Sequence, residues 1–238
     1  MLSLKDLLLA AQNLACQKIA VVSANDEAVV EAVEQARQMG FIRPVLIGPK
    51  EQISPIILTK KYHLPHYEII DACSDEQASL IAMDLVNRHQ IDFIMKGLLD
   101  TKILLKAVVN KERGIRKAPL LSHVGIVSYP DFNRLLFVTD GAMNIAPDVN
   151  EKMAIIANAV ELAKTLGYEQ PKVGLVAAVE KLNPKMASTV DAEALVNLYQ
   201  QGLIKDCLLD GPFAIDNLVS KEAALHKGIK SEVAGQAD

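Results

Sequence analysis

Residues 18–23 read KIAVVS, and similar runs follow at PVLIG (44–48), YEIID (67–71) and IDFIMKG (91–97). These runs are largely apolar instead of alternating with polar residues, which is typical of strands covered on both faces in a parallel sheet. Helix signals separate them: Ser74 followed by Gln77 predicts a capped helix start, and Gly40 stands where a helix would end. The alternation of strands and helices predicts an α/β fold of the doubly wound class.

The same alternation continues in the second half, with LLSHVGIVS (120–128), RLLFVT (134–139), KVGLVAAV (172–179) and DCLLDG (206–211). Gly167 and Gly202 again stand at expected helix ends. These elements are too many for one small sheet, and the least regular connection is PDFNRLLFVTDGAMNIAPD (130–148). We therefore expect two domains, residues 1–139 and 140–238, that face each other across a cleft.

The composition excludes several classes of protein. The chain has 238 residues, 50% of them hydrophobic and 23% charged, so it can bury a sizeable core. A formal net charge of −4 and the absence of Trp argue against a general nucleic-acid binder, which needs a basic face or aromatic stacking platforms. No apolar run approaches the length of a membrane span, and the N-terminus does not read as a signal peptide.

The cysteines point to a reducing compartment. Cys16, Cys73 and Cys207 lie far apart and match no metal or redox spacing. Cys207 falls inside the apolar run DCLLDG and is expected to be a buried thiol. The predicted location is the cytoplasm.

A basic segment follows the strand IDFIM. It contains seven basic residues and two acidic ones, the basic ones being Lys96, Lys102, Lys106, Lys111, Arg113, Arg116 and Lys117. A helix is expected to begin near Asp100 or Thr101, directly after Gly97, and such a strand–glycine–helix junction suits an anion. The alternative is a solvated helix face, because some of these residues have helical spacing. From the residues alone, both interpretations stay open.

Polar residues also follow the strands of the second half. Asp140 and Asn144 lie in TDGAMNIAPD (139–148), where Asp148 or Asn150 is expected to cap the next helix. In VEKLNPKM (179–186), Asn183 and Lys185 stand in a loop after a strand. Their positions suit substrate contacts, although a lone lysine in a loop usually faces solvent.

Two further expectations concern the end of this half. A helix after residue 186 should be capped by Ser188 or Thr189. In DGPFAIDNLVS (210–220), Asp210 and Gly211 should mark a strand exit, and Asp216 the first turn of a helix. Asp216 could complement the helix dipole or face a substrate.

Several long motifs together closely resemble the phosphate acetyltransferase and phosphate butyryltransferase family, and they follow the butyryltransferase pattern. The motifs are MKGLLDTKILLKAVVNKERGIR (95–116), LSHVGIV (121–127), TDGAMNIAPD (139–148), VEKLNPKM (179–186), STVDAEAL (188–195) and DGPFAIDNLVSKEAALHKGIKSEVAG (210–235). The resemblance runs from about Lys5 to Asp238. It implies two α/β/α domains with mainly parallel sheets, of the isocitrate/isopropylmalate-dehydrogenase-like type, and a homo-oligomer.

The resemblance also implies an activity, the reversible transfer of a short acyl group, butyryl or similar, between coenzyme A and inorganic phosphate, yielding butyryl phosphate. Coenzyme A would be a substrate and no cofactor or metal is expected. Phosphate would attack the thioester directly, without a covalent enzyme intermediate. Anionic groups would be held by Lys96, Gly97, Thr101 and Lys106. The acyl and phosphate side would be lined by Asp140, Asn144, Asn183, Lys185 and Asp216.

The family pattern continues past the residues matched here, through a segment with a Ser-Arg pair that contacts phosphate. We therefore assign no catalytic residue, and expect an incomplete first domain and activity at least about a hundredfold below that of a chain with such a segment. The alternative is a non-catalytic paralogue that binds coenzyme A or a protein partner, or an inactive truncated gene product.

Overall fold

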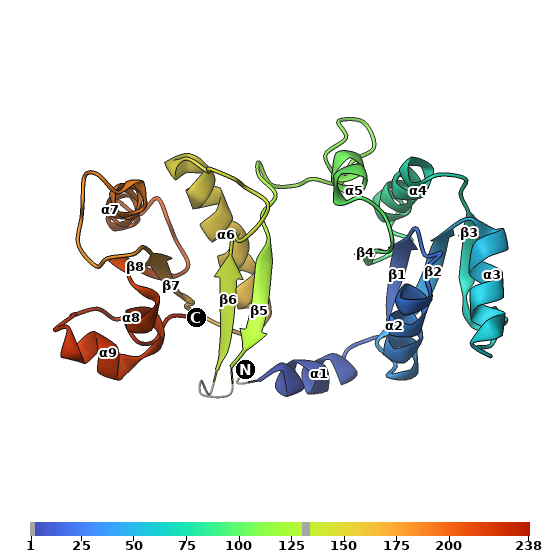
Figure 1. The fold of residues 1–238 in the computed structure, drawn as a ribbon, viewed down its shortest axis with the longest axis horizontal. Coiled ribbons are helices and arrows are strands. Elements are labelled where there is room, and N and C mark those ends of the chain that lie inside the picture. The colour runs from blue at the N-terminus through green and yellow to red at the C-terminus, as the bar shows by residue number, and fades with distance from the viewer. Residues whose placement is uncertain (1–2, 130–133) are drawn as a thin grey trace. The chain divides into compact units, whose positions relative to one another are not determined.

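The computed structural model describes residues 3–129 and 134–238 (Figure 1). The chain divides into two compact units, residues 8–117 and residues 118–238 with the stretch up to Leu7. We name them the N-terminal and C-terminal units. The expected boundary at 139/140 differs from this division. The strand that ends at Thr139 pairs with the one before it, so both belong with the residues that follow.

A four-stranded parallel sheet forms the centre of the N-terminal unit. Its order is β3-β2-β1-β4, with β1 at Gln17–Val22, β2 at Ile42–Gly48, β3 at Glu68–Asp71 and β4 at Phe93–Lys96. The helices are α1 (Leu4–Gln12, which crosses the division between the units), α2 (Glu27–Gln38), α3 (Lys50–Thr59), α4 (Asp75–Asn87) and α5 (Thr101–Val108), with a 3-10 turn at Leu64–His66. The four apolar runs are therefore strands, as predicted.

Both faces of this sheet are covered. Along β1, Ala20 and Val22 pack against the α4 and α5 side, while Ile19 and Val21 pack against α2 and α3. Figure 1 shows the two helix pairs on opposite faces of the strands. This burial on both faces explains why the runs lack polar alternation.

The local signals agree with the structure. The Ser74 side chain accepts a hydrogen bond from the Gln77 N–H, and the Gln77 side chain accepts one from the Cys73 N–H at 2.7 Å. Gly40, Gly167 and Gly202 have φ values of 80°, 91° and 75°, the left-handed region in which glycine is favoured.

The C-terminal unit contains two separate pairs of strands. β5 (Val124–Ser128) is antiparallel to β6 (Leu135–Thr139), and β7 (Lys172–Val176) is parallel to β8 (Leu208–Phe213). The helices are α6 (Val149–Thr165), α7 (Ala187–Gln200), α8 (Ile215–Val219) and α9 (Lys221–His226). The expected parallel arrangement holds for β7 and β8 and fails for β5 and β6, because the few residues between these two strands in sequence are too short for the crossover that a parallel pair needs.

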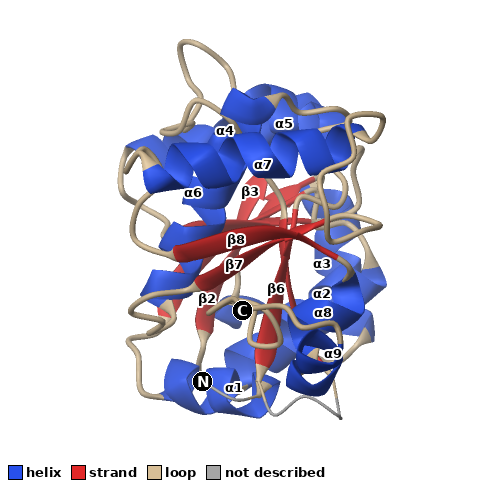
Figure 2. Ribbon diagram, turned by 90° about the vertical axis from the view of Figure 1, so that its left-hand side faces the viewer, coloured by secondary structure: helices blue, strands red, loops and turns tan. Residues whose placement is uncertain are grey.

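Helices cover both faces of β7 and β8. One core joins α6 and α7 to the strands through Ile156, Leu195 and Leu209, and a second packs Leu218 of α8 against Phe213. Figure 2 shows α6 and α7 on one side of these strands and α8 and α9 on the other. The fold is thus α/β with helical layers in each unit. Within residues 3–129 and 134–238, no helix is long and apolar enough to cross a membrane.

Candidate functional site

The carboxyl edge of the N-terminal sheet has the geometry of a ligand site. The strand order reverses between β1 and β4, and ligands of open α/β sheets bind outside the carboxyl ends at such a point. Ser23 follows β1 there, and Gly97 follows β4. The Gly97 N–H donates to the Val22 carbonyl at 2.8 Å, and a Cβ on Gly97 would lie 2.3 Å from the Ser23 carbonyl oxygen. Only glycine fits at this position.

Ser23 was not among the residues expected from the sequence. It is 1% exposed, has φ 56°, and its hydroxyl donates to Asp75 at 2.6 Å. Asp75 begins α4, so this bond ties the end of β1 to that helix. The rule that ligands gather at strand exits could have identified Ser23, because it follows KIAVV directly.

The expected anion-binding residues lie on the loop and helix after β4. The Lys96 ammonium donates to the carbonyls of Leu99 at 2.8 Å and Gly97 at 3.3 Å. The helix α5 begins near Asp100 or Thr101, as predicted: Thr101 is its exposed first residue, and the Asp100 side chain caps it. Lys106 is exposed near the end of the same helix. The structure brings Lys96, Gly97 and Thr101 into one loop–helix junction, with Lys106 further along α5.

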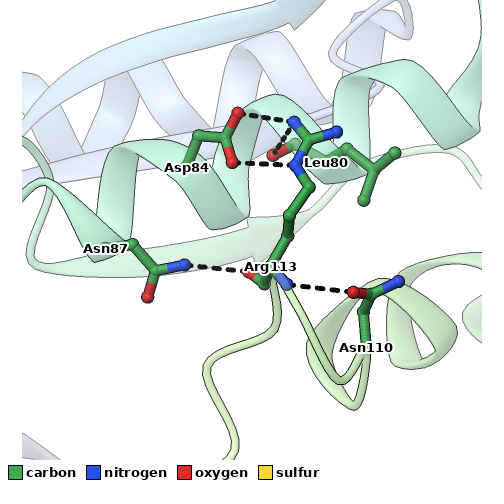
Figure 3. Close-up of polar contacts among 5 residues, drawn as sticks. All are labelled: Leu80, Asp84, Asn87, Asn110 and Arg113. Atoms are coloured by element: carbon green, nitrogen blue, oxygen red, sulfur yellow. Dashed lines mark hydrogen bonds and ion pairs between the residues drawn. The ribbon is translucent and has the colours of Figure 1, made fainter.

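Arg113 is the exception in the basic segment, because its charge is used within the unit (Figure 3). Its guanidinium donates to both carboxylate oxygens of Asp84 on α4, at 3.0 and 2.5 Å. Its carbonyl accepts from Asn87, and its N–H donates to Asn110. This bidentate contact lowers the pKa of Asp84. Arg113 therefore fastens the segment after α5 to α4. Because its charge is already paired with Asp84, it is not among the charges that could bind an anion.

The other basic residues of the segment remain available. Within the described part of the chain, none of them forms an ion pair; they are Lys96, Lys102, Lys106, Lys111, Arg116 and Lys117. A binding measurement separates an anion site from a solvated face, since only an anion site depends on these charges.

Asp140 organises the loop after β6. Its carboxylate accepts from the N–H groups of Ala142, Met143 and Asn144 at 3.0–3.2 Å and from the Asn144 amide. Burial acts to raise its pKa, but these hydrogen bonds outweigh it, so the pKa is lowered. The Asn144 amide also donates to the Leu121 carbonyl at 2.9 Å. Asp140 and Asn144 lie together as expected, yet much of their bonding capacity holds the loop itself.

A cavity of about 250 Å³ opens beside Asp140, at the ends of β6 and β7 and between α6 and α7. We name it the Asp140 cavity. Its lining is Thr139, Asp140, Pro147, Lys152, Ile155, Ile156, Val173, Gly174, Leu175, Val176, Ser188, Asp191, Ala192 and Leu195. Lys152 of α6 and Asp191 of α7 form an ion pair in this lining. The sequence carried no signal for this pair, because each residue reads as a solvated helix position.

Asn183 shapes the loop before α7. Its side-chain oxygen accepts from the Lys185 N–H at 3.0 Å. Its N–H and its carbonyl both bond the Thr189 hydroxyl, each at 2.9 Å. Lys185 is exposed. The expected cap at Ser188 or Thr189 is wrong, because α7 begins at Ala187, before both residues. Thr189 is fully buried, and its hydroxyl ties the loop to the first turn of the helix.

Asp216 lies in the first turn of α8, as predicted, and belongs to a polar cluster. Lys227 donates to Glu180 at 2.5 Å and lies 3.8 Å from Asp216, while the buried Asn217 amide also donates to Glu180 at 2.5 Å. The Lys227 contact lowers the pKa of Glu180. Asp216 thus lies beside an ion pair.

The expected strand exit at Asp210 and Gly211 is wrong, since both lie within β8.

Nucleophile and metal candidates are weak. Cys207 is 3% exposed in the core of the C-terminal unit, as predicted, and burial raises its pKa to about 11. Among the described residues, no three or more His, Cys, Asp or Glu side chains come together in a group that could hold a metal ion. The groups that could contact a substrate are therefore the charges of the basic segment, the side-chain amides of Asn144 and Asn183, and the lining of the Asp140 cavity.

Comparison with known proteins decides the family. The Phosphate acetyl/butaryl transferase family model matches residues 74–238. The chain belongs to this family. Phosphate butyryltransferase of Clostridium beijerinckii is 43% identical over 222 residues, which cover 93% of this chain and 74% of that protein. Phosphate acetyltransferase of Thermotoga maritima is 42% identical, with 93% and 75% covered.

A solved member of the group has the same fold. The branched-chain phosphotransacylase of Enterococcus faecalis superposes with a TM-score of 0.83 at 26% identity, covering 93% of this chain and 77% of that one. The chain is therefore an acyltransferase that moves an acyl group between coenzyme A and phosphate.

Proposed function

We propose that this transferase uses butyryl or a similarly short acyl group and that the Asp140 cavity holds it. The supporting observation is the cavity's size and lining. Its volume of about 250 Å³ is below the 300–1,000 Å³ of pockets that enclose a drug-sized ligand. Apolar side chains such as Ile156 and Leu195 form part of its wall, and Asp140 and Lys152 are among its polar residues. A short acyl chain with its polar head matches this lining, whereas a whole coenzyme A does not.

The reaction is a direct displacement. A phosphate oxygen attacks the thioester carbonyl carbon, the C–O bond forms, the C–S bond breaks, and the departing thiolate takes a proton from solvent. The protein contributes proximity and stabilisation of the developing negative charge. The phosphates of coenzyme A are held at the carboxyl edge of the N-terminal sheet, by Lys96 and Lys106 and by N–H groups at the start of α5, near Gly97 and Thr101.

The second half supplies the remaining contacts. Asp140, Asn144, Asn183, Lys185 and Asp216 line the acyl and phosphate side, on loops that follow strands or begin helices of the C-terminal unit. Coenzyme A and phosphate are the only small molecules required, and the chain assembles as a homo-oligomer. The three cysteines, all free thiols, support a cytoplasmic location.

Acyl-chain preference tests the cavity. Thiol release is measured with phosphate and acetyl-, butyryl- or hexanoyl-coenzyme A. We expect the highest kcat/KM for butyryl-coenzyme A. Ser188 lines the cavity, and the substitution Ser188→Leu should lower kcat/KM for butyryl-coenzyme A about tenfold. The reason is that a change of one methylene group in an apolar pocket alters kcat/KM about 10–200-fold.

Val190→Leu is the matched control, since Val190 lies on the same helix and outside the cavity lining. It should leave the preference unchanged. Equal loss for all three substrates in Ser188→Leu would contradict the assignment of the cavity. No thiol release from any substrate would instead favour a paralogue that only binds coenzyme A.

A further inference from the structure

Two carboxylates gather at the edge of the C-terminal unit where the parallel strands β7 and β8 end. The Ala177 N–H, directly after β7, donates to the Phe213 carbonyl of β8 at 2.9 Å, so the two strand exits lie side by side. Glu180 lies in the loop after β7, and Asp216 lies in the first turn of α8, which follows β8. Both carboxylates are therefore at the edge where ligands of parallel sheets bind.

Lys227 joins these carboxylates. It directly follows α9, which lies beside α8 (Figures 1 and 2). Its ammonium donates to the Glu180 carboxylate at 2.5 Å and lies 3.8 Å from the Asp216 carboxylate, so one cation faces two anions. Solvent reaches all three side chains, with exposed fractions of 43% for Lys227, 26% for Glu180 and 57% for Asp216. A dissolved anion can therefore approach them.

A buried amide fixes the Glu180 carboxylate. The Asn217 amide donates at 2.5 Å to the same Glu180 oxygen that Lys227 contacts, and Asn217 is fully buried. Within the described residues, the side-chain oxygen of Asn217 has no hydrogen-bond partner. The amide is thus turned toward Glu180 although its own oxygen stays unsatisfied, which is costly for a buried group. This contact holds the Glu180 charge at a fixed place beside Lys227.

The cluster carries one negative charge, since two carboxylates face one ammonium. Inorganic phosphate is an anion at neutral pH, so Lys227 attracts it and both carboxylates repel it. Without the ammonium, the repulsion from Glu180 and Asp216 would be uncompensated. The affinity of this edge for phosphate therefore depends on the charge of Lys227.

We infer that Lys227 sets the affinity of this transferase for phosphate by offsetting the carboxylates of Glu180 and Asp216. The inference rests on the proposed function, which places Asp216 on the phosphate side. Lys227 is a positioning residue in this role, because it acts through its charge on the approach of phosphate and not on the reacting atoms. Glu180 holds the ammonium in place, and Asn217 holds Glu180.

The test measures the dissociation constant for phosphate by phosphorus NMR titration, which also detects weak binding, and the KM for phosphate with butyryl-coenzyme A. Lys227→Met should raise both about fivefold at low ionic strength, because two uncompensated carboxylates then repel phosphate. The difference should shrink as salt screens the charges. Glu180→Gln should act in the opposite direction and strengthen phosphate binding, since Lys227 then faces only Asp216. The KM for butyryl-coenzyme A should change little in either variant.

A double variant separates charge from structure. Lys227→Met with Glu180→Gln restores the net charge of the cluster, so phosphate binding should return to within about twofold of the unchanged chain. A purely structural role predicts no such return, because the double variant also lacks the ion pair. Lys221→Met is the matched control on α9: Lys221 is exposed and forms no ion pair within the described residues, so phosphate binding should stay the same.

Asp216→Asn distinguishes failure of this inference from failure of the proposed function. A shifted phosphate affinity in Asp216→Asn, with an unchanged affinity in Lys227→Met, would overturn the inference and keep Asp216 on the phosphate side. Unchanged affinity in both variants would overturn the placement of Asp216 as well. An equal loss in Lys227→Met and in the double variant would also overturn the inference, because the ion pair would then act through the fold.

Discussion

Glu34 is a carboxylate on α2 that is 4% exposed and carries four hydrogen bonds. Arg37 donates two of them, at 2.7 and 2.8 Å, and Gln38 and Tyr67 donate the others. The Arg37 contact is the main cause that lowers the pKa of Glu34 to about 2, against an opposing effect of burial. The folded state therefore favours the charged form.

This pKa gives a prediction about acid stability. A carboxyl group whose pKa is lowered on folding stabilises the protein above its unfolded pKa of 4.5, and that stability is lost as the pH falls toward 2. The shift corresponds to at most about 3 kcal/mol. Glu34→Gln should lower the free energy of unfolding at pH 7 and flatten its decline between pH 4.5 and 2. Urea unfolding at pH 7, 4 and 2.5 measures this.

Glu31→Gln is the control on the same helix, because its ion pair with Lys60 is exposed and such pairs contribute little. An unchanged pH profile in Glu34→Gln would mean that other groups cause the acid sensitivity.

At the scale of elements, we expect coenzyme A binding to depend on the segment formed by β4, the following loop and α5. Lys96→Ala with Lys106→Ala should weaken the affinity for coenzyme A about tenfold at low ionic strength, and the difference should shrink as salt screens the charges. Calorimetry at two salt concentrations measures both effects.

Lys18→Ala with Arg43→Ala is the matched control. It removes the same charge from the opposite, amino-terminal edge of the same sheet, where the two residues are register partners on β1 and β2. An equal loss of affinity in both double variants would show that only net charge matters. Unchanged affinity in the first would leave the solvated-face interpretation.

For the whole molecule, the four core clusters each lie within one unit. Met83 in the N-terminal unit and Leu195 in the C-terminal unit are 0% and 2% exposed. Met83→Ala and Leu195→Ala should each cost about 2–5 kcal/mol, mainly in their own unit. Amide exchange should then accelerate at β1 in the first variant and at β7 in the second. Equal acceleration at both strands in either variant would show that the units unfold together.

Local chemistry explains what could be predicted from the sequence. The strands of the N-terminal unit are recognisable because they are apolar throughout. The caps at Ser74 and Asp148 are recognisable because each side chain accepts a hydrogen bond from an N–H group close to it in sequence. The same holds for Cys207, whose burial follows from its apolar neighbours. The long motifs also identified the family, since they extend over much of the chain.

Contacts between distant residues decided the rest. Only folding shows that Arg113 is paired with Asp84, or that Lys152 meets Asp191, because pairs 29 and 39 residues apart leave no periodic pattern. The division at residue 117 and the burial of Thr189 likewise depend on which strands pair and which loop returns to a helix. The sequence alone thus determined which residues are candidates for the site. Which of their charges stay available was decided by the tertiary structure, since a charge is neutralised by whatever the fold places beside it.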